Sequence, residues 1–274
     1  MKSVAYLGPE GTFSHLVARK RFGARARLVP CASIYDIFAY AKGGANRLGV
    51  VPSENSSGGT IFESIDGLVE NAGRLHIREE LSLNVKLALL GHRGHRVQDL
   101  YSHFVPLQHC GPWIRKHLPG VKTHAIASTA KAAALAATTT SAAAFGTRDA
   151  ARRYGLDILK FPVETDAPNI TEFLVIGTSQ KPEPRSTKTS LMVMLENRPG
   201  SLFDFLAAFK NSGVNLTRLL SRPIIGQPKN YLFVVDIQGA PTRPAVQTAL
   251  HAAQAAAAKL VRLGVYPVRK MYAS

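Results

Sequence analysis

The chain has 274 residues, of which 46% are hydrophobic and 19% are charged. This composition is typical of a globular protein and excludes a disordered or collagen-like chain. At roughly 100–200 residues per domain, the length predicts two domains. The longest apolar runs fall well short of the ~20 residues that a membrane-spanning helix needs, and the N-terminal residues read as a strand rather than a signal peptide. We therefore expect a soluble, cytoplasmic protein without membrane contacts.

The net charge is +16, from 34 Lys and Arg against 18 Asp and Glu. Such a balance raises the possibility of nucleic-acid binding. The basic residues are scattered, however, and aromatic residues are not interleaved with them, so attraction of a small anionic substrate or a basic host proteome explains the charge as well. Two cysteines, Cys31 and Cys110, are too few for a disulfide framework. No Cys-x-x-Cys or His-x-x-x-His spacing occurs, so we expect no metal site.

The first part of the chain alternates between strand and helix patterns. We expect strands at residues 3–7, 27–31, 47–51, 83–90, 100–103, 124–127, 142–145, 158–161 and 173–176. Helices are expected at residues 13–22, 33–41, 61–70, 129–137 and 147–154, with one more that carries Trp113. This alternation predicts α/β layers with a largely parallel sheet.

A polar, proline-containing stretch at residues 178–188 reads as a linker. After it, strand patterns at residues 189–195, 214–220, 231–237 and 261–266 enclose two helical patterns, one beginning at Pro199 and one at 245–259. The order βαββαβ predicts a ferredoxin-like unit. We therefore expect one domain over residues 1–178 and a second over residues 188–274.

Three polar loops flank apolar strands, at residues 8–15, 52–60 and 169–173. Their Ser, Thr, Asn and Gly residues supply neutral donors and backbone N–H groups, which suit carboxylates and hydroxyls. The same residue types also make turns and cap helices. The chain has no dinucleotide fingerprint, no phosphate loop and no nucleophile elbow. Composition and spacing alone therefore predict an α/β protein for a small ligand with a second small domain.

Longer motifs lead further. They are Ala5-Tyr-Leu-Gly-Pro-Glu-Gly-Thr-Phe-Ser-His15, Gly49-Val-Val-Pro-Ser-Glu-Asn-Ser-Ser-Gly-Gly59, Asp166-Ala-Pro-Asn-Ile-Thr-Glu-Phe-Leu-Val-Ile-Gly177, Asn197-Arg-Pro-Gly-Ser-Leu202 and Asn215-Leu-Thr-Arg-Leu-Leu-Ser-Arg-Pro223. Together, and in this order, they resemble the prephenate dehydratases that carry a C-terminal ACT domain. The resemblance covers essentially the whole chain.

The resemblance implies a fold and a reaction. The fold is a catalytic domain of two α/β lobes, like a periplasmic binding protein, with the site in the cleft between them, followed by the ACT domain. The reaction converts prephenate to phenylpyruvate with loss of water and carbon dioxide. Aromatisation drives it, so no cofactor is expected. The resemblance also implies phenylalanine as an allosteric effector and a homodimer or dimer of dimers.

Residue roles follow from the same resemblance. Thr171 is the expected donor to the departing hydroxyl, and Asn55 and Ser102 are expected to act with it. The remaining substrate-binding residues are expected to be Thr12, Ser14, Asn169, Phe173 and His109. The expected effector-binding residues are Gly200, Ser201, Leu202, Asn215, Leu216, Ser221 and Arg222.

Three departures from the family pattern bear on function. Glu172 stands where the family has arginine, but strand alternation predicts that it faces away from Thr171. His109 replaces a glutamine, which bears on the substrate. Leu220 replaces a glutamate of the effector motif, so we expect weaker binding of the effector. Two alternatives stay open: a dehydratase acting on a related cyclohexadienol such as arogenate, and a non-catalytic amino-acid sensor. Nucleic-acid binding is a third and more distant alternative.

Overall fold

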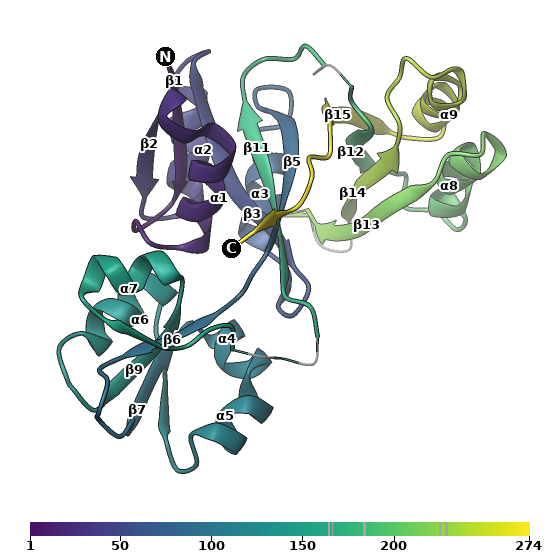
Figure 1. Cartoon of the computed structure of the whole chain (residues 1–274). Coiled ribbons are helices and arrows are strands. Elements are labelled where there is room, and N and C mark those ends of the chain that lie inside the picture. The colour runs from purple at the N-terminus through teal and green to yellow at the C-terminus, as the bar shows by residue number, and fades with distance from the viewer. Residues whose placement is uncertain (164, 166, 183–184, 225, 228–229) are drawn as a thin grey trace.

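The computed structural model describes residues 1–274 except 164, 166, 183–184, 225 and 228–229. Asp166, which opens the third motif, therefore lies outside the described residues. Figure 1 shows an N-terminal lobe, a second lobe inserted into it, and a C-terminal unit beside the first lobe.

The first lobe is built on a mixed sheet. Its strands lie in the order β5-β11-β3-β1-β2. They are β1 (Lys2–Leu7), β2 (Ala26–Cys31), β3 (Arg47–Asn55), β5 (His76–Asn84) and β11 (Ile170–Gly177), with a short β4 (Gly59–Thr60) beside β3. The helices are α1 (Phe13–Phe22), α2 (Ile34–Lys42) and α3 (Phe62–Glu70), with a 3-10 turn η1 (Gly23–Arg25). The expectation of a largely parallel sheet was wrong, because β11 returns from the second lobe antiparallel to both β3 and β5.

The second lobe has a five-stranded sheet in the order β10-β6-β9-β7-β8. Its strands are β6 (Ala88–Gly91), β7 (Asp99–Ser102), β8 (Lys122–Ala125), β9 (Ala142–Gly146) and β10 (Asp157–Lys160). Its helices are α4 (Phe104–His109), α5 (Gly111–His117), α6 (Thr129–Ala136) and α7 (Arg148–Tyr154). The predicted strand at 83–90 was wrong, since β5 ends at Asn84 and β6 begins at Ala88 in the other lobe. An apolar run does not reveal where the chain leaves one core for another.

The C-terminal unit has the predicted βαββαβ order. It comprises β12 (Lys188–Met194), α8 (Ser201–Asn211), β13 (Leu216–Pro223), β14 (Tyr231–Gln238), α9 (Pro244–Ala255) and β15 (Lys259–Tyr266), and a final β16 (Tyr272–Ala273) returns to β5. The sheet order is β13-β14-β12-β15. The strands predicted at 189–195 and 231–237 correspond to β12 and β14, and both are internal to this sheet. The edge strand is β13.

The C-terminal unit and the first lobe share one sheet and one hydrophobic core. β15 pairs in parallel with β5 through Gly264 and Ile77, so that a single sheet of 11 strands runs through both units. A Cβ atom on Gly264 would lie 2.5 Å from the Ile77 carbonyl oxygen, so only glycine allows this approach. Buried Leu174 of the first lobe belongs to the same cluster as Met192 and Tyr266 of the C-terminal unit. Separating the two units would therefore expose apolar surface.

Among the helices that the structure describes, none combines the length and apolar character that a membrane-spanning helix requires. Within the same described residues, no group of three or more His, Cys, Asp and Glu side chains is arranged to hold a metal ion.

Candidate active site

Two of the predicted site residues lie opposite each other on neighbouring strands. β3 runs through to Asn55 and β11 begins at Ile170, so residues predicted in polar loops belong to paired strands. In the antiparallel register Thr171 faces Asn55, and Glu172 faces Glu54. The Asn55 side-chain Nδ2 donates to Thr171 Oγ1 at 2.9 Å. Residues 116 positions apart in the chain thus form one polar pair.

The orientation of the Asn55 amide follows from its partners. Its Oδ1 accepts hydrogen bonds from the backbone N–H groups of Ser57, at 2.9 Å, and Gly58, at 2.8 Å. The NH₂ group must therefore face Asn169 Oδ1, at 2.8 Å, and Thr171 Oγ1. Because the Thr171 oxygen accepts from Asn55, its own hydroxyl hydrogen is left to donate. Within the described residues no acceptor takes that hydrogen.

His109 connects the second lobe to the loop after Asn55. Its Nδ1 lies 2.8 Å from Ser57 Oγ, and its Nε2 lies 3.0 Å from Thr165 Oγ1. The Thr165 hydroxyl donates to the Ala167 carbonyl at 3.0 Å, so its oxygen must accept from His109 Nε2–H. Nδ1 then accepts from the Ser57 hydroxyl. This arrangement needs a neutral imidazole, and burial lowers the pKa of His109 accordingly.

A cavity of about 360 Å³ lies where the first loop meets helix α7 of the second lobe. Ion pairs Arg19–Asp149 and Arg153–Glu10 cross between the lobes here. The lining residues are Glu10, Gly11, His15, Arg19, Asp149, Arg152 and Arg153. Three arginines against two carboxylates leave the cavity positively charged, which favours an anionic ligand.

The first loop and β7 supply three more predicted residues. The Thr12 hydroxyl accepts from the His15 N–H at 3.2 Å and so caps α1, and it lies 3.0 Å from two backbone carbonyls. Ser14 is buried within α1. Ser102 is fully buried at the end of β7, and its hydroxyl has no hydrogen-bond partner among the described residues. Among the described residues, no hydrogen bond joins any of the three to Asn55 or Thr171.

Phe173, whose substrate contact stays a prediction, is packed in the core of the first lobe. The side chain is 1% exposed and belongs to the first lobe's core with Tyr6 and Val50. It points to the same face as Thr171, but it lies two residues further into the strand, where the core covers that face. Thr171 is at the strand end and remains half-buried.

Comparisons with known proteins agree with this architecture. The family model described as prephenate dehydratase matches residues 4–181, and the ACT domain model matches residues 189–254. The chain belongs to the prephenate dehydratase family. The predictions of the family, of the two-lobed fold with an ACT domain and of the enzyme are confirmed.

Three similar proteins illustrate the relationship. A bifunctional chorismate mutase/prephenate dehydratase of Stutzerimonas stutzeri is 36% identical over 96% of this chain and 73% of its own length. A prephenate dehydratase of Arthrobacter aurescens, solved in complex with L-Phe, has a TM-score of 0.87 and 27% identity, covering 97% of this chain and 90% of that one. A structure described as a novel type of quorum quenching acylase has a TM-score of 0.85 and 26% identity, with 98% of both chains covered.

Within one dehydratase chain the predicted effector residues do not converge. Gly200 adopts φ +84° at the start of α8, next to the buried Ser201, while Leu202 packs against the ACT core. The exposed Asn215 and the half-buried Leu216 lie at the other end of the ACT sheet, because Leu216 pairs with Ile237 whereas Arg222 pairs with Leu232.

Arg222 and its neighbours face different environments. The Arg222 guanidinium binds the Asp66 carboxylate of α3 through two hydrogen bonds, at 2.6 and 2.8 Å, and lies over the Phe62 ring. Ser221 is exposed, and Leu220 packs against the core shared with the first lobe. Arg222 is therefore part of the contact between the ACT domain and the catalytic domain.

Glu172 points away from Thr171, as strand alternation predicted, and meets a residue that the sequence analysis missed. Arg218 Nη2 lies 3.2 Å from Glu172 Oε2 and 2.9 Å from Glu54 Oε2. Arg218 and Arg222 occupy the same face of β13, since burial alternates along that strand. A reversed charge at 172, together with two arginines four positions apart and so on one face of a strand, was the available signal.

Proposed function

We propose that this dehydratase converts prephenate to phenylpyruvate at the Asn55–Thr171 pair. The observation that carries the proposal is the hydrogen bond from Asn55 Nδ2 to Thr171 Oγ1, which leaves the threonine O–H to donate. A donor placed at the departing oxygen stabilises charge that develops in the transition state. Asn169 holds the other side of the Asn55 amide and so fixes the geometry.

The reaction needs little more than a positioned donor. The bond between the ring and its carboxylate breaks, carbon dioxide leaves, and the electron pair of that bond forms a new ring double bond as the neighbouring double bond shifts. The ring's C–O bond breaks at the same time, and the leaving hydroxide takes up a proton from solvent to become water. Because charge on the departing oxygen grows along this path, the Thr171 hydrogen bond strengthens toward the transition state. The bond that Thr171 accepts from Asn55 polarises its O–H group further.

The assay that tests the proposal follows phenylpyruvate enolate absorbance after prephenate is added to the purified protein. Turnover that falls sharply in Thr171→Ala supports the proposal. Turnover with arogenate alone would favour the alternative, an arogenate dehydratase. Two plant relatives of this chain carry that name. No turnover with either substrate would favour a non-catalytic sensor.

The Ser57–His109 contact raises acyl transfer as another use of the same cleft residues, because a serine beside a neutral histidine is a common nucleophile pair. An acyl-transfer site also needs N–H groups for the oxyanion. The N–H groups of Ser57 and Gly58 instead donate to Asn55 Oδ1. Dehydration therefore remains the function that the geometry supports best, and an N-acyl amide serves as the control substrate.

We also propose phenylalanine as the effector, bound between the ACT domains of two chains. The ACT domain and the solved relative in complex with L-Phe support this. Leu220 lacks the carboxylate that the family motif provides, so we expect weaker inhibition. Isothermal titration with L-Phe and with L-Leu as control tests it.

The exposed edge strand β13 favours pairing with a second chain. We expect a homodimer or dimer of dimers by light scattering, and a monomer at micromolar concentration would contradict this. The cytoplasmic location stays a prediction for cell fractionation.

A further inference from the structure

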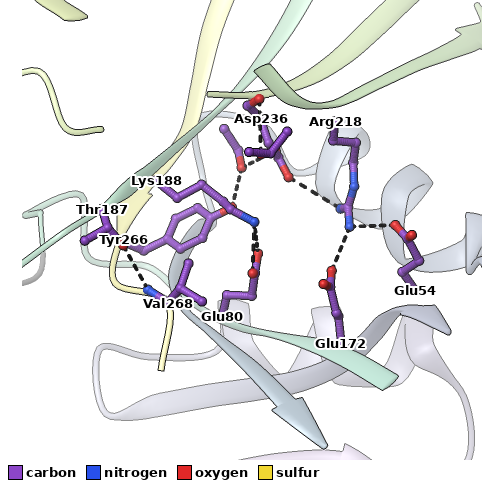
Figure 2. A network of polar contacts seen from close by, with 11 residues as sticks. Glu54, Glu80, Glu172, Thr187, Lys188, Arg218, Asp236, Tyr266 and Val268 are labelled. Atoms are coloured by element: carbon purple, nitrogen blue, oxygen red, sulfur yellow. Dashed lines mark hydrogen bonds and ion pairs between the residues drawn. The ribbon is translucent and has the colours of Figure 1, made fainter. Parts of the chain in front are cut away.

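The ACT domain contacts the reverse side of the strand ends that carry Asn55 and Thr171. Figure 2 shows the Arg218 guanidinium between Glu54 and Glu172, at 2.9 and 3.2 Å. Glu54 directly precedes Asn55 in the chain, and Glu172 directly follows Thr171. The two glutamates face each other across β3 and β11. Because successive side chains of a strand point to opposite faces, Arg218 lies behind the catalytic pair.

The pairing of β11 with β3 is irregular near the strand ends that Arg218 contacts, although β11 is also paired with β5 and β3 with β4. The register of β11 with β3 shifts between Glu172 and Phe173, which leaves Ser53 as an extra residue on β3. Only the pairs at Thr171 and Glu172 lie beyond this bulge. Bulges disrupt the ladder locally and redirect side chains. Two like charges directly opposite each other, Glu54 and Glu172, would also push the ends apart.

Arg218 is itself held rigidly by the ACT domain. Its side chain is 11% exposed, and its Nη1 lies 3.6 Å from the Asp236 carboxylate. Asp236 accepts from the Ser190 hydroxyl at 2.5 Å, and Ser190 Oγ lies 2.6 Å from the Tyr266 hydroxyl. These residues come from all four strands of the ACT sheet and are almost completely buried. The guanidinium therefore has little freedom to follow a displaced strand end.

We propose that Arg218 is a positioning residue of this enzyme, which holds Glu54 and Glu172 together and thereby keeps Asn55 and Thr171 in hydrogen-bonding register. The inference rests on the proposed function at the Asn55–Thr171 pair. It also gives the ACT domain a physical connection to that pair, because any movement of β13 moves the guanidinium.

The test begins with Arg218→Gln in the full chain. We expect kcat for prephenate to fall on the order of ten-fold or more, since a misplacement of about 1 Å can cost roughly 10²-fold. KM should change less than about two-fold, because binding groups outside the pair are retained. The matched control is Arg269→Gln. Arg269 also pairs with a carboxylate, that of Glu79 on β5, at 2.8 Å, and its replacement should leave kcat unchanged.

Rescue separates positioning from a general loss of structure. In Arg218→Gln/Glu172→Gln the opposed charges are gone, so we expect most of kcat to return. Arg218→Lys keeps a charge but lacks the planar fork that bridges two carboxylates, so it should lie between wild type and Arg218→Gln. This variant carries the test if Arg218→Gln does not fold.

A measurement without substrate distinguishes this inference from the proposed function. The Thr171 methyl resonance in threonine-labelled protein should move in Arg218→Gln, return in the double variant and stay in place in Arg269→Gln. If wild type does not turn over prephenate, the proposed function fails while this resonance still decides the positioning role. Wild-type kcat together with an unmoved Thr171 resonance in Arg218→Gln would overturn the inference.

Discussion

Asn55 donates a hydrogen bond from its side-chain amide to the Thr171 hydroxyl oxygen at 2.9 Å, across two antiparallel strands. The threonine is thereby an acceptor toward the protein and a donor toward whatever lies in front of it. A free serine or threonine hydroxyl rotates to suit its surroundings. Here the second hydrogen bond limits that rotation, so the strand pairing orients the proton as well as the oxygen.

Replacing Thr171 by alanine removes the donor and should lower kcat by about 10²–10³-fold, equivalent to about 3–4 kcal/mol. KM and the melting temperature should change little, because Thr171 is half-buried and lies at a strand end. Thr171→Ser keeps the hydroxyl and should retain much of the activity. Steady-state kinetics with prephenate checks this, and a near-normal kcat in Thr171→Ala would remove the residue from the mechanism.

The His109 contacts predict a pH dependence. Burial lowers the pKa of His109 below its ordinary value of 6.5, so the folded state favours the neutral ring. Just below pH 6.5 the unfolded state then binds more protons than the folded state. The stability that the neutral His109 contributes is lost as pH falls through the lowered pKa, and the hydrogen bond from Ser57 is lost with it. We expect an acid limb in kcat/KM below pH 6.5. It should disappear in His109→Gln, since glutamine can accept from Ser57 and donate to Thr165 without titrating. An unchanged acid limb in that variant would assign it to another group.

Glu172 should cost stability rather than provide it. Burial, and then the nearby Glu80 carboxylate, raise the pKa of Glu172 above its ordinary value of 4.5. Between pH 4.5 and the raised pKa of Glu172, the folded state binds more protons than the unfolded state. The free energy of unfolding therefore falls as pH rises through this range. Glu172→Gln should therefore melt at or above the wild-type temperature at pH 7, while Arg218 keeps Glu54 and Asp236. The difference in melting temperature between Glu172→Gln and wild type should shrink below pH 4.5. A lower melting temperature at pH 7 would contradict this expectation.

Gly264 should be intolerant of any side chain. An added Cβ would meet the Ile77 carbonyl oxygen at 2.5 Å, and that atom belongs to the backbone of a central strand. Gly264→Ala must therefore push β15 away from β5, and overpacking of this kind typically costs about 1–3 kcal/mol. Denaturant unfolding measures the loss. Stability equal to wild type would mean that the two units do not depend on this contact.

The shared core bears on truncation. If the ACT domain were an independent unit, removal of residues 187–274 would abolish inhibition and leave some turnover. Leu174 and Ile77, however, are buried in the cluster that contains Met192 and Tyr266, and Glu80 would lose Lys188, its partner at 2.7 Å. We therefore expect the truncated chain to be poorly soluble, which is why substitutions such as Arg218→Gln are the better probe of the ACT domain.

The sequence by itself determined whatever depends on near neighbours in the chain. The helix predicted at 13–22 matches α1, and the linker predicted at 178–188 overlaps the interval between β11, which ends at Gly177, and β12, which begins at Lys188. Glu172 faces away from Thr171 because side chains alternate along any strand. The motifs also identified the family, since long segments in a set order are specific without reference to space.

Only the tertiary structure decided how distant strands pair. Residue 55 meets residue 171, His109 crosses from one lobe to the other, and Arg218 stands behind the pair from a third unit. Each contact joins residues at least 46 positions apart and depends on strand register and on a bulge in β3. No local periodicity encodes those features, because register is set by the buried faces of both partners together.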